Sequence, residues 1–304
     1  MEIAFIGLGH MGAPMAANLV KAGHRVVGFD LAPAANEAAL AAGVEIAESG
    51  AAAARSADVV ITMLQQGRQV IAAYEGGDGA SGLLESARPG ALFIDSSTIS
   101  VADARVAHEL AARAGFHALD APVSGGVVGA EAGTLAFMVG GSAEDFAAAE
   151  PVFGAMGARI VHCGGPGLGQ AAKICNNLML GISMIGVSEA FVLGERLGLT
   201  DQALYDVASN ASGQCWSLTT NCPVPGPVPS SPANHGYRPG FAAALMAKDL
   251  GLAEDAIGDT GAHAELGRLA AEIFRRFSTE GGAESDFSAI IEDIRARSET
   301  KATA

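Results

Sequence analysis

Residues 2–30 read EIAFIGLGHMGAPMAANLVKAGHRVVGFD, and this stretch decides the fold of the first half of the chain. An apolar run of strand character leads into Gly7, Gly9 and Gly12, a helical stretch follows, and a second apolar run ends at Asp30. This order of strand, glycine-rich turn, helix, strand and acid is typical of a βαβ unit that binds a dinucleotide. In that unit the first glycine permits a tight turn and the second lets the backbone approach a pyrophosphate. The third allows close packing of the helix, whose N-terminus offers N–H donors.

Asp30 indicates which dinucleotide is bound. A carboxylate at this position accepts hydrogen bonds from the ribose hydroxyls of NAD and repels the 2′-phosphate of NADP. Leu31, Ala32 and Pro33 follow, so no arginine stands ready for that phosphate. We therefore predict NAD as the cofactor, held by Gly7, Leu8, Gly9, His10, Met11, Gly12 and Asp30. A glycine turn without a ligand, beside a solvated Asp30, is the alternative interpretation.

The alternation of strands and helices continues to about residue 163. Further apolar runs typical of strands lie at 59–63, 92–94, 116–119, 135–139 and 159–162. This rhythm predicts an α/β fold in which helices cover a doubly wound parallel sheet of the Rossmann type. A cluster of glycines and a proline at 164–169 ends the rhythm. We place the boundary there, with a dinucleotide-binding domain over 1–163 and a substrate and oligomerisation domain over 164–304.

The second domain is predicted to be all-helical. Helical patterns cover 170–197, 204–209, 245–257 and 263–277. The six prolines within 221–240 predict a long loop with no helix or inner strand. Residues 174–188 carry no charge, but this run is shorter than the roughly 20 apolar residues of a membrane span. We interpret it as a buried core helix.

The composition limits the partners and the compartment. Half of the 304 residues are hydrophobic and 17% are charged, which favours well-filled cores. A net charge of −15 repels nucleic acid and anionic membranes, so we expect neither as a partner. The four cysteines show no CxxC spacing, so we predict no metal site and a reducing compartment. No basic leader precedes the first strand, which favours the cytoplasm.

Lys173 is the first candidate for acid–base chemistry. The chain has only four lysines among its 18 basic residues, and Lys173 lies in an apolar helical segment four residues before Asn177. Residues four apart share one helix face. Desolvation in an apolar cleft lowers the pKa of a lysine, which can then exchange a proton near neutral pH. Asn177 could orient the substrate oxygen. The alternative is a lysine that extends from a buried helix to solvent.

Two further segments carry candidate binding residues. Lys248 and Asp249 form a charged pair between apolar residues, which makes them candidate binding residues. The alternative is an ordinary ion pair on the protein surface. Ser124, Gly125 and Gly126 follow an apolar run, and their hydroxyl and backbone N–H groups could form an anion-binding nest for a small carboxylate. A plain loop is the alternative at this position.

Four segments, in order along the chain, resemble the β-hydroxyacid dehydrogenase family: GLGHMGAPMAANL at 7–19, DAPVSGG at 120–126, GQAAKICNN at 169–177 and KDL at 248–250. The resemblance covers essentially the whole chain. It implies that Lys173 is the general acid/base with Asn177 as its partner, and that Ser124, Gly125 and Gly126 hold the substrate carboxylate. It also implies the remaining contacts: Leu64, Gln65, Thr98 and Lys248 along the cofactor, with Lys248, Asp249 and Trp216 at the substrate.

Within this family, the 3-hydroxyisobutyrate dehydrogenase subgroup is the most similar. SGQCWSLTTNCPVPG at 212–226 and LMAKDLGLA at 245–253 carry this finer resemblance. It implies NAD-linked oxidation of 3-hydroxyisobutyrate to methylmalonate semialdehyde in valine catabolism, by a homodimer or homotetramer. His10 replaces the usual asparagine of the glycine loop, and Gln65 stands where a proline is usual. His10 keeps its backbone N–H for phosphate, and Gln65 puts only an adenosine-side contact in doubt.

Two rival functions remain open. One is a related enzyme of the family, such as a tartronate or succinic semialdehyde reductase, which would share the glycine loop and the lysine. The other is a dinucleotide-binding sensor without turnover. Retention of both Lys173 and Asn177 argues against the sensor.

Overall fold

The computed structural model describes residues 1–77 and 79–300, and it contains two compact units, Met1–Lys173 and Ile174–Ala304. The change from one unit to the other falls inside helix α9 (Leu168–Arg196). The boundary predicted from the sequence, between residues 163 and 164, falls earlier, at the end of the last strand of the sheet.

The first unit is built on a large, mostly parallel sheet in the order β11-β10-β8-β7-β4-β1-β2-β3. Its strands are β1 (Glu2–Ile6), β2 (Arg25–Phe29), β3 (Glu45–Ile46), β4 (Val59–Thr62), β7 (Leu92–Asp95), β8 (His117–Asp120), β9 (Val123–Ser124), β10 (Leu135–Gly140) and β11 (Gly157–Gly164). A separate two-stranded hairpin joins β5 (Gly76–Gly77) and β6 (Ala80–Ser81). The strand order reverses between β1 and β4, and at such a switch point ligands bind beyond the carboxyl ends of the strands.

One part of the sheet departs from the predicted parallel arrangement. β10 pairs antiparallel with β8 and with β9, although β11 runs parallel to β10. The connection between β9 and β10 contains the short helix α7 (Gly126–Ala132). A crossover to a parallel neighbour needs a dozen or more residues, so this shorter connection returns the chain in the opposite direction.

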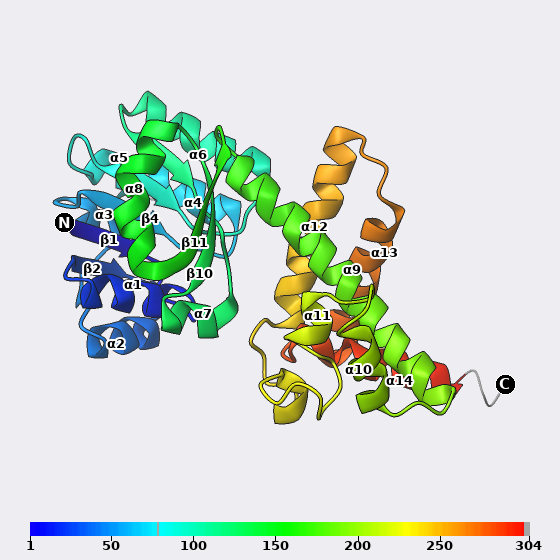
Figure 1. Cartoon of the computed structure of the whole chain (residues 1–304). Coiled ribbons are helices and arrows are strands. Elements are labelled where there is room, and N and C mark those ends of the chain that lie inside the picture. Colours follow the sequence, from blue (N-terminus) through cyan, green and yellow to red (C-terminus); the bar gives the residue numbers. More distant parts are fainter. Residues whose placement is uncertain (78, 301–304) are drawn as a thin grey trace. The chain divides into compact units, whose positions relative to one another are not determined.

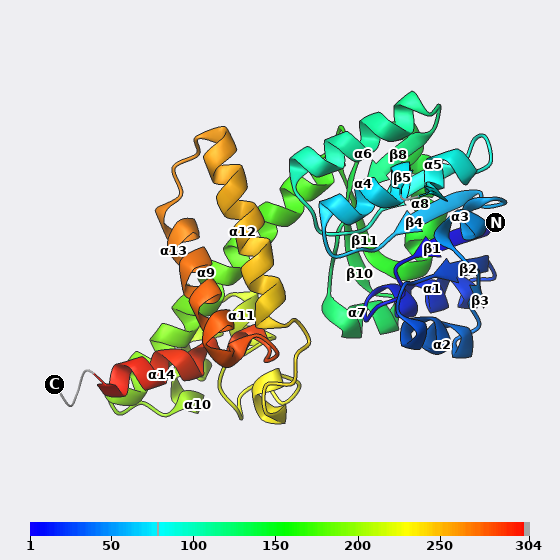
Figure 2. The ribbon, with the colours of Figure 1, turned by 180° about the vertical axis from the view of Figure 1, so that it is seen from behind.

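Helices cover both faces of the sheet, as a doubly wound fold requires. Hydrophobic residues of α1 (Gly12–Lys21), α2 (Pro33–Ala41), α7 and α8 (Ala143–Met156) form one core cluster with the sheet. Residues of α3 (Gly50–Ala54), α4 (Gly67–Glu75), α5 (Leu83–Ser86) and α6 (Val101–Arg113) form the second. Figure 1 shows α8 in front of the strands, and Figure 2, from behind, shows α4 and α6. This confirms the predicted Rossmann architecture.

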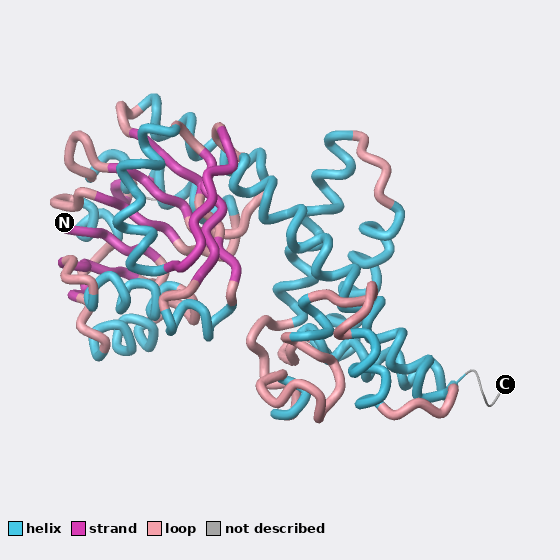
Figure 3. The backbone as a smooth tube through the Cα atoms, viewed as in Figure 1, coloured by secondary structure: helices cyan, strands magenta, loops and turns pink. Residues whose placement is uncertain are grey.

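The second unit is helical, as predicted. Beyond α9 its elements are α10 (Asp201–Ala208), α11 (Trp216–Thr219), the 3₁₀ turn η1 (Pro232–His235), α12 (Ala243–Thr260), α13 (Glu265–Phe277), the π turn η2 (Ser278–Gly282), the 3₁₀ turn η3 (Phe287–Ala289) and α14 (Ile290–Thr300). Figure 3 shows all strands of the described chain in the first unit. Met184, Met246 and Phe274, from α9, α12 and α13, meet in one buried core.

The prediction that residues 221–240 hold no helix is wrong at one point. Pro232–His235 form a 3₁₀ turn, which a proline tolerates because Pro232 occupies the first turn, where no N–H is needed. The rest of this loop is packed rather than loose. Cys222, Val224 and Val228 are buried against Phe191 of α9 and Ile291 of α14.

Helix α9 has the length and hydropathy that a membrane span would need, and it is the one such helix in residues 1–77 and 79–300. A core helix of a soluble protein passes the same test. Met184, Ile185 and Phe191 of α9 lie in the cores of the second unit, which agrees with the predicted core helix.

Candidate active site

The glycine loop between β1 and α1 has the shape that a dinucleotide needs. Gly7 has a φ of +97°, and a Cβ there would lie 2.3 Å from the Met63 carbonyl oxygen. A Cβ on Gly12 would lie 1.9 Å from the Gly7 carbonyl oxygen, so the helix start contacts the turn directly. Gly9 differs, because it is exposed and a Cβ there would meet nothing within 4 Å. This open space in front of Gly9 and the N-terminus of α1 is where a pyrophosphate can approach.

Asp30 lies at the end of β2 and is tied to this loop. Its Oδ2 accepts the Leu8 N–H at 2.7 Å and its Oδ1 accepts the Ala32 N–H at 2.8 Å. Asn36 accepts the Asp30 N–H at 2.9 Å and donates to the Asp30 carbonyl at 2.8 Å. The carboxylate is therefore held in one orientation, with further lone pairs available for ribose hydroxyls. The Leu8 side chain itself lies in the core.

The predicted cofactor residues Leu64, Gln65 and Thr98 follow two neighbouring strands, β4 and β7. Ser97 connects their loops by accepting the Leu64 N–H at 2.8 Å. Leu64 and Thr98 are partly buried and Gln65 is exposed, so all three lie at the carboxyl edge of the sheet with accessible surface.

Asp95, which the sequence analysis did not single out, holds the loops at this edge of the sheet through buried hydrogen bonds. Its Oδ1 accepts hydrogen bonds from Thr62 Oγ1 at 2.7 Å and Ser97 Oγ at 2.6 Å. Its Oδ2 is buried without a hydrogen-bond partner. Burial raises the pKa of Asp95 to about 6, and the nearby Asp120 carboxylate adds to the increase. Asp95 thus supports the loops that carry Leu64 and Thr98.

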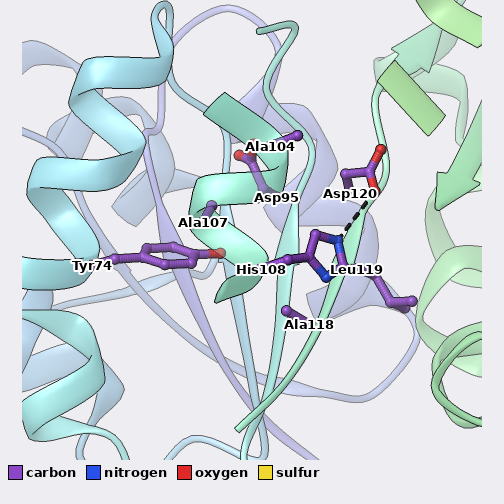
Figure 4. Close-up of a pocket in the computed structure, with 8 residues that line it drawn as sticks. All are labelled: Tyr74, Asp95, Ala104, Ala107, His108, Ala118, Leu119 and Asp120. Carbon is purple, nitrogen blue, oxygen red and sulfur yellow. Dashed lines mark hydrogen bonds and ion pairs between the residues drawn. The ribbon is translucent and has the colours of Figure 1, made fainter. Parts of the chain in front are cut away.

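Asp120, at the end of β8, belongs to the segment DAPVSGG, from which the sequence predicts no role for it. It accepts the backbone N–H groups of Gly167 at 2.8 Å and Gln170 at 2.9 Å, at the start of α9. His108 of α6 approaches the same carboxylate, with Nε2 3.1 Å from Oδ1 (Figure 4). His108 and Asp120, together with Tyr74 and Asp95, line a small pocket (Figure 4).

Lys173 lies three residues beyond Gln170 on α9 and is only 7% exposed. Gln170 itself is fully buried, donates to the Ser97 carbonyl at 2.7 Å and accepts the Ile99 N–H at 3.2 Å. The first turn of α9 is thus tied to the loop that contains Thr98. A buried lysine on a helix held in this way suits proton transfer better than a solvated surface lysine does.

In the second unit, Asn177, Lys248 and Asp249 form a hydrogen-bonded cluster, here termed the helical cluster. Asn177 and Asp249 are 72 positions apart in the sequence. Asn177 Nδ2 donates to Asp249 Oδ2 at 2.6 Å, and Lys248 Nζ lies 3.2 Å from Asp249 Oδ1. Asn177 is 1% exposed and Asp249 is 4% exposed. Asn176 donates to Asn177 Oδ1 at 3.0 Å, so both ends of the Asn177 amide are oriented.

Ser124 and the two glycines after it form a turn at the end of β9. Gly125 has a φ of +134° and Gly126 a φ of +61°. Both conformations favour glycine, and they lead directly into α7. Ser124 is partly buried and Gly125 is exposed, so the hydroxyl and the adjacent backbone N–H groups can meet a small anion.

Trp216 begins α11 and is 51% exposed. A single half-exposed aromatic side chain is ordinary on a protein surface, so the substrate contact of Trp216 stays a prediction. The other predicted residues divide between the units: the glycine loop, 64–65, Thr98, 124–126 and Lys173 belong to the first, and Asn177, Trp216, Lys248 and Asp249 to the second.

Three supporting residues, Asp95, Asp120 and Gln170, were missed by the sequence analysis. Each had a weak signal, because Asp95 and Asp120 follow apolar runs and Gln170 stands in the quoted segment GQAAKICNN. Acids at the carboxyl ends of neighbouring parallel strands meet at one edge, which is the rule that could have found the first two.

Two family models together match most of the chain. The NAD-binding domain of 6-phosphogluconate dehydrogenase matches residues 2–165. The model described as NAD-binding of NADP-dependent 3-hydroxyisobutyrate dehydrogenase matches residues 167–294.

Curated relatives are similar over nearly the full length. The chain is 56% identical to a probable 3-hydroxyisobutyrate dehydrogenase of Mycobacterium bovis, over 98% of this chain and 99% of the relative. It is 47% identical to an NAD-dependent L-serine dehydrogenase of Pseudomonas aeruginosa, over 95% of this chain and 96% of the relative. The solved structure of 3-hydroxyisobutyrate dehydrogenase of Mycobacterium tuberculosis with L-serine is 56% identical, with a TM-score of 0.91 over 96% of this chain and 98% of that one.

Proposed function

This chain belongs to the β-hydroxyacid dehydrogenase family of nicotinamide-dependent oxidoreductases, and on that premise we propose that it oxidises 3-hydroxyisobutyrate to methylmalonate semialdehyde. The observation that carries the proposed chemistry is the buried Lys173, held on the same helix as an oriented Asn177. The resemblance adds valine catabolism and a homodimer or homotetramer to the proposal, and the cytoplasm remains the proposed location.

The residues of the first unit fit a bound dinucleotide. The open surface at Gly9 and the N-terminus of α1 would receive the pyrophosphate, and Asp30 would accept the ribose hydroxyls. Leu64, Gln65 and Thr98 would line the path at the carboxyl edge of the sheet. When bound, the nicotinamide supplies the acceptor for the hydride that leaves the substrate.

NAD is proposed over NADP because of Asp30. Its carboxylate is held by Leu8 and Ala32, so it cannot turn away from a 2′-phosphate without losing two hydrogen bonds. The residue after it, Leu31, is exposed and uncharged. A phosphate placed there would face a fixed negative charge, and none of the residues 31–33 carries a positive charge to offset it.

The substrate carboxylate is assigned to Ser124, Gly125 and Gly126, where a partly buried hydroxyl adjoins the backbone N–H groups of a glycine turn. Lys173 in its neutral form accepts the proton of the substrate hydroxyl as the C–H bond breaks. The lysine then returns that proton to solvent before the next turnover.

Asn177 is assigned as a donor to the substrate oxygen. Its Oδ1 already accepts from Asn176 and one hydrogen of its Nδ2 is given to Asp249, which leaves the second Nδ2 hydrogen for the substrate. A donor is what an oxygen needs when it loses its proton. Asp249 is therefore better assigned to orienting Asn177 and Lys248 than to touching an anionic substrate, which it would repel.

Oxidation of L-serine is the second candidate, because a 47% identical relative is an NAD-dependent L-serine dehydrogenase. Serine differs from 3-hydroxyisobutyrate by an ammonium group in place of a methyl group. That ammonium would need an acceptor. The higher identity to a probable 3-hydroxyisobutyrate dehydrogenase, 56% against 47%, favours the substrate with the methyl group.

The test is the initial rate of NADH formation with (S)-3-hydroxyisobutyrate, L-serine, glycerate and 4-hydroxybutyrate at equal concentrations. We expect the highest kcat/KM with 3-hydroxyisobutyrate, and a lower rate when NADP replaces NAD. A preference for L-serine would keep the roles of Lys173 and Asn177 but overturn the proposed substrate. Binding of NAD without turnover of any of these acids would favour the sensor.

A further inference from the structure

We infer that Asp120 is a positioning residue for Lys173: its carboxylate holds the first turn of α9, and His108 holds that carboxylate in place. This inference rests on the proposed function, because it takes Lys173 as the acid/base. Asp120 is 1% exposed and lies at the end of β8, so it acts through the helix rather than on a substrate.

The partners of Asp120 define its task. All three are donors: the N–H of Gly167, the N–H of Gln170 and Nε2 of His108. Two of these come from the start of α9, whose first N–H groups have no partner within the helix. The Asp120 carboxylate comes from β8, a strand far from α9 in the sequence. It accepts hydrogen bonds from those donors and complements the partial positive charge of the helix N-terminus.

Close backbone packing also fixes the position of the first turn of α9. A Cβ on Gly169 would lie 2.4 Å from the Met138 carbonyl oxygen, and a Cβ on Gly140 would lie 2.4 Å from Asp120 Oδ1. The start of α9 therefore lies directly against β8 and β10, which only glycine permits. Lys173 follows within one helical turn, so a shift or rotation of this turn moves its amine.

The first turn of α9 also connects Lys173 to the edge of the sheet where the cofactor is proposed to bind. Through Gln170, it is tied to the backbone of Ser97 and Ile99 on either side of Thr98. If the hydrogen bonds from this turn to Asp120 are lost, the position of Lys173 relative to the loop that contains Thr98 is no longer fixed. A misplacement of about 1 Å at a reacting group can cost roughly 100-fold in rate.

The charged and titratable groups around Asp120 come from several elements. Asp95 lies on β7, His108 on α6 and Cys163 on β11, and the Asp120 charge contributes to raising the pKa values of Asp95 and Cys163. The carboxylate accepts from three donors in spite of this acidic neighbour. An amide at position 120 would offer one acceptor and one donor group, so it cannot satisfy the three donors.

The experiment compares Asp120→Asn with Asp145→Asn as a matched control. Asp145 is also a carboxylate at a helix start in the first unit, near Ser142 and with His117 Nδ1 at 2.8 Å, but its helix, α8, carries none of the proposed site residues. We expect Asp120→Asn to lower kcat by roughly 10- to 100-fold with an unchanged Kd for NAD. Asp145→Asn should keep both values.

A second readout works without turnover. Competitive labelling of lysines with acetic anhydride across a pH series, read by peptide mass spectrometry, gives the pH midpoint at which Lys173 loses its proton. Removing the Asp120 charge makes the ammonium less favourable, so this midpoint should fall in Asp120→Asn and stay in place in Asp145→Asn. If the wild-type protein oxidises no hydroxy acid, the proposed function fails, and the labelling still decides the role of Asp120.

His108 supplies a second pair of variants in case Asp120→Asn does not fold. His108→Leu removes one donor and should lower kcat by about fivefold, the equivalent of about 1 kcal/mol. His108→Gln keeps an N–H donor at a similar reach and should restore most of that loss. The inference is overturned if kcat and the Lys173 midpoint stay at wild-type values in the folded variants, or if Asp145→Asn loses as much activity as Asp120→Asn.

Discussion

The glycine loop of residues 7–12 and the helical cluster of Asn177, Lys248 and Asp249 differ in what they would offer to a bound ligand. The loop offers backbone and empty space: Gly9 leaves its surroundings open, and Gly7 and Gly12 allow close contacts that a Cβ would prevent. The cluster offers side chains, whose orientations are set by hydrogen bonds between residues far apart in the sequence.

This difference predicts which property a substitution in each region should change. A loop that depends on the absence of side chains is damaged by adding one atom, and its damage should appear in binding or folding. A cluster that depends on orientation is damaged by exchanging a donor for an acceptor, and its damage should appear in kcat. The following predictions test that contrast, from the largest expected effect to the smallest.

Lys173→Ala should give the largest change. We expect kcat to fall by roughly 10²- to 10⁴-fold, because a positioned acid/base contributes about that much to the rate. Fluorescence titration should show an unchanged Kd for NAD. Lys21→Ala, at an exposed position of α1, is the control and should behave like the wild type. Normal turnover by Lys173→Ala would remove the lysine from the mechanism.

Gly9→Ala and Gly12→Ala should separate binding from folding within one loop. At Gly9 an added methyl group meets no protein atom, so the protein should fold normally while the Kd for NAD rises by roughly 10- to 100-fold, equivalent to 1–3 kcal/mol of steric cost. At Gly12 the methyl group would collide with the Gly7 carbonyl, so the unfolding temperature should fall as well.

Gly154→Ala is the control for both glycine variants, because its position on α8 is open and alanine favours a helix. It should leave the Kd for NAD unchanged and should not lower the unfolding temperature. An unchanged Kd in Gly9→Ala would contradict the placement of the pyrophosphate.

Asp249→Asn should give a smaller loss that depends on Asn177. If Asp249 orients the Asn177 amide, the kcat of the double variant Asn177→Ala/Asp249→Asn should be close to that of Asn177→Ala alone. The coupling free energy should then be about 1–3 kcal/mol in a double-mutant cycle. Asp255→Asn, an exposed acid on the same helix α12, should show no coupling. Additive losses would mean that Asp249 acts on the substrate by a separate route.

Much of the fold could be predicted from sequence because it depends on local patterns. The strands β4 and β7 and the long helix α9 lie where apolar periodicity predicted them, with ends differing by one or two residues, and β1 and β2 are the two apolar runs on either side of α1. The antiparallel β10 and the 3₁₀ turn at Pro232 were not predicted, because strand direction and loop packing depend on contacts outside the local pattern.

The sequence by itself determined the glycine loop, Asp30 and the candidate lysine, because each is a contiguous motif whose chemistry follows from neighbouring residues. Only the tertiary structure decided which side chains support that chemistry. Asp120 reaches Gly167 and Gln170 across 47 and 50 positions, and Asp249 reaches Asn177 across 72. Hydrogen bonds over such separations form where strand ends and helix faces meet, and the packing of the sheet and helices, rather than any local pattern, sets those meeting points.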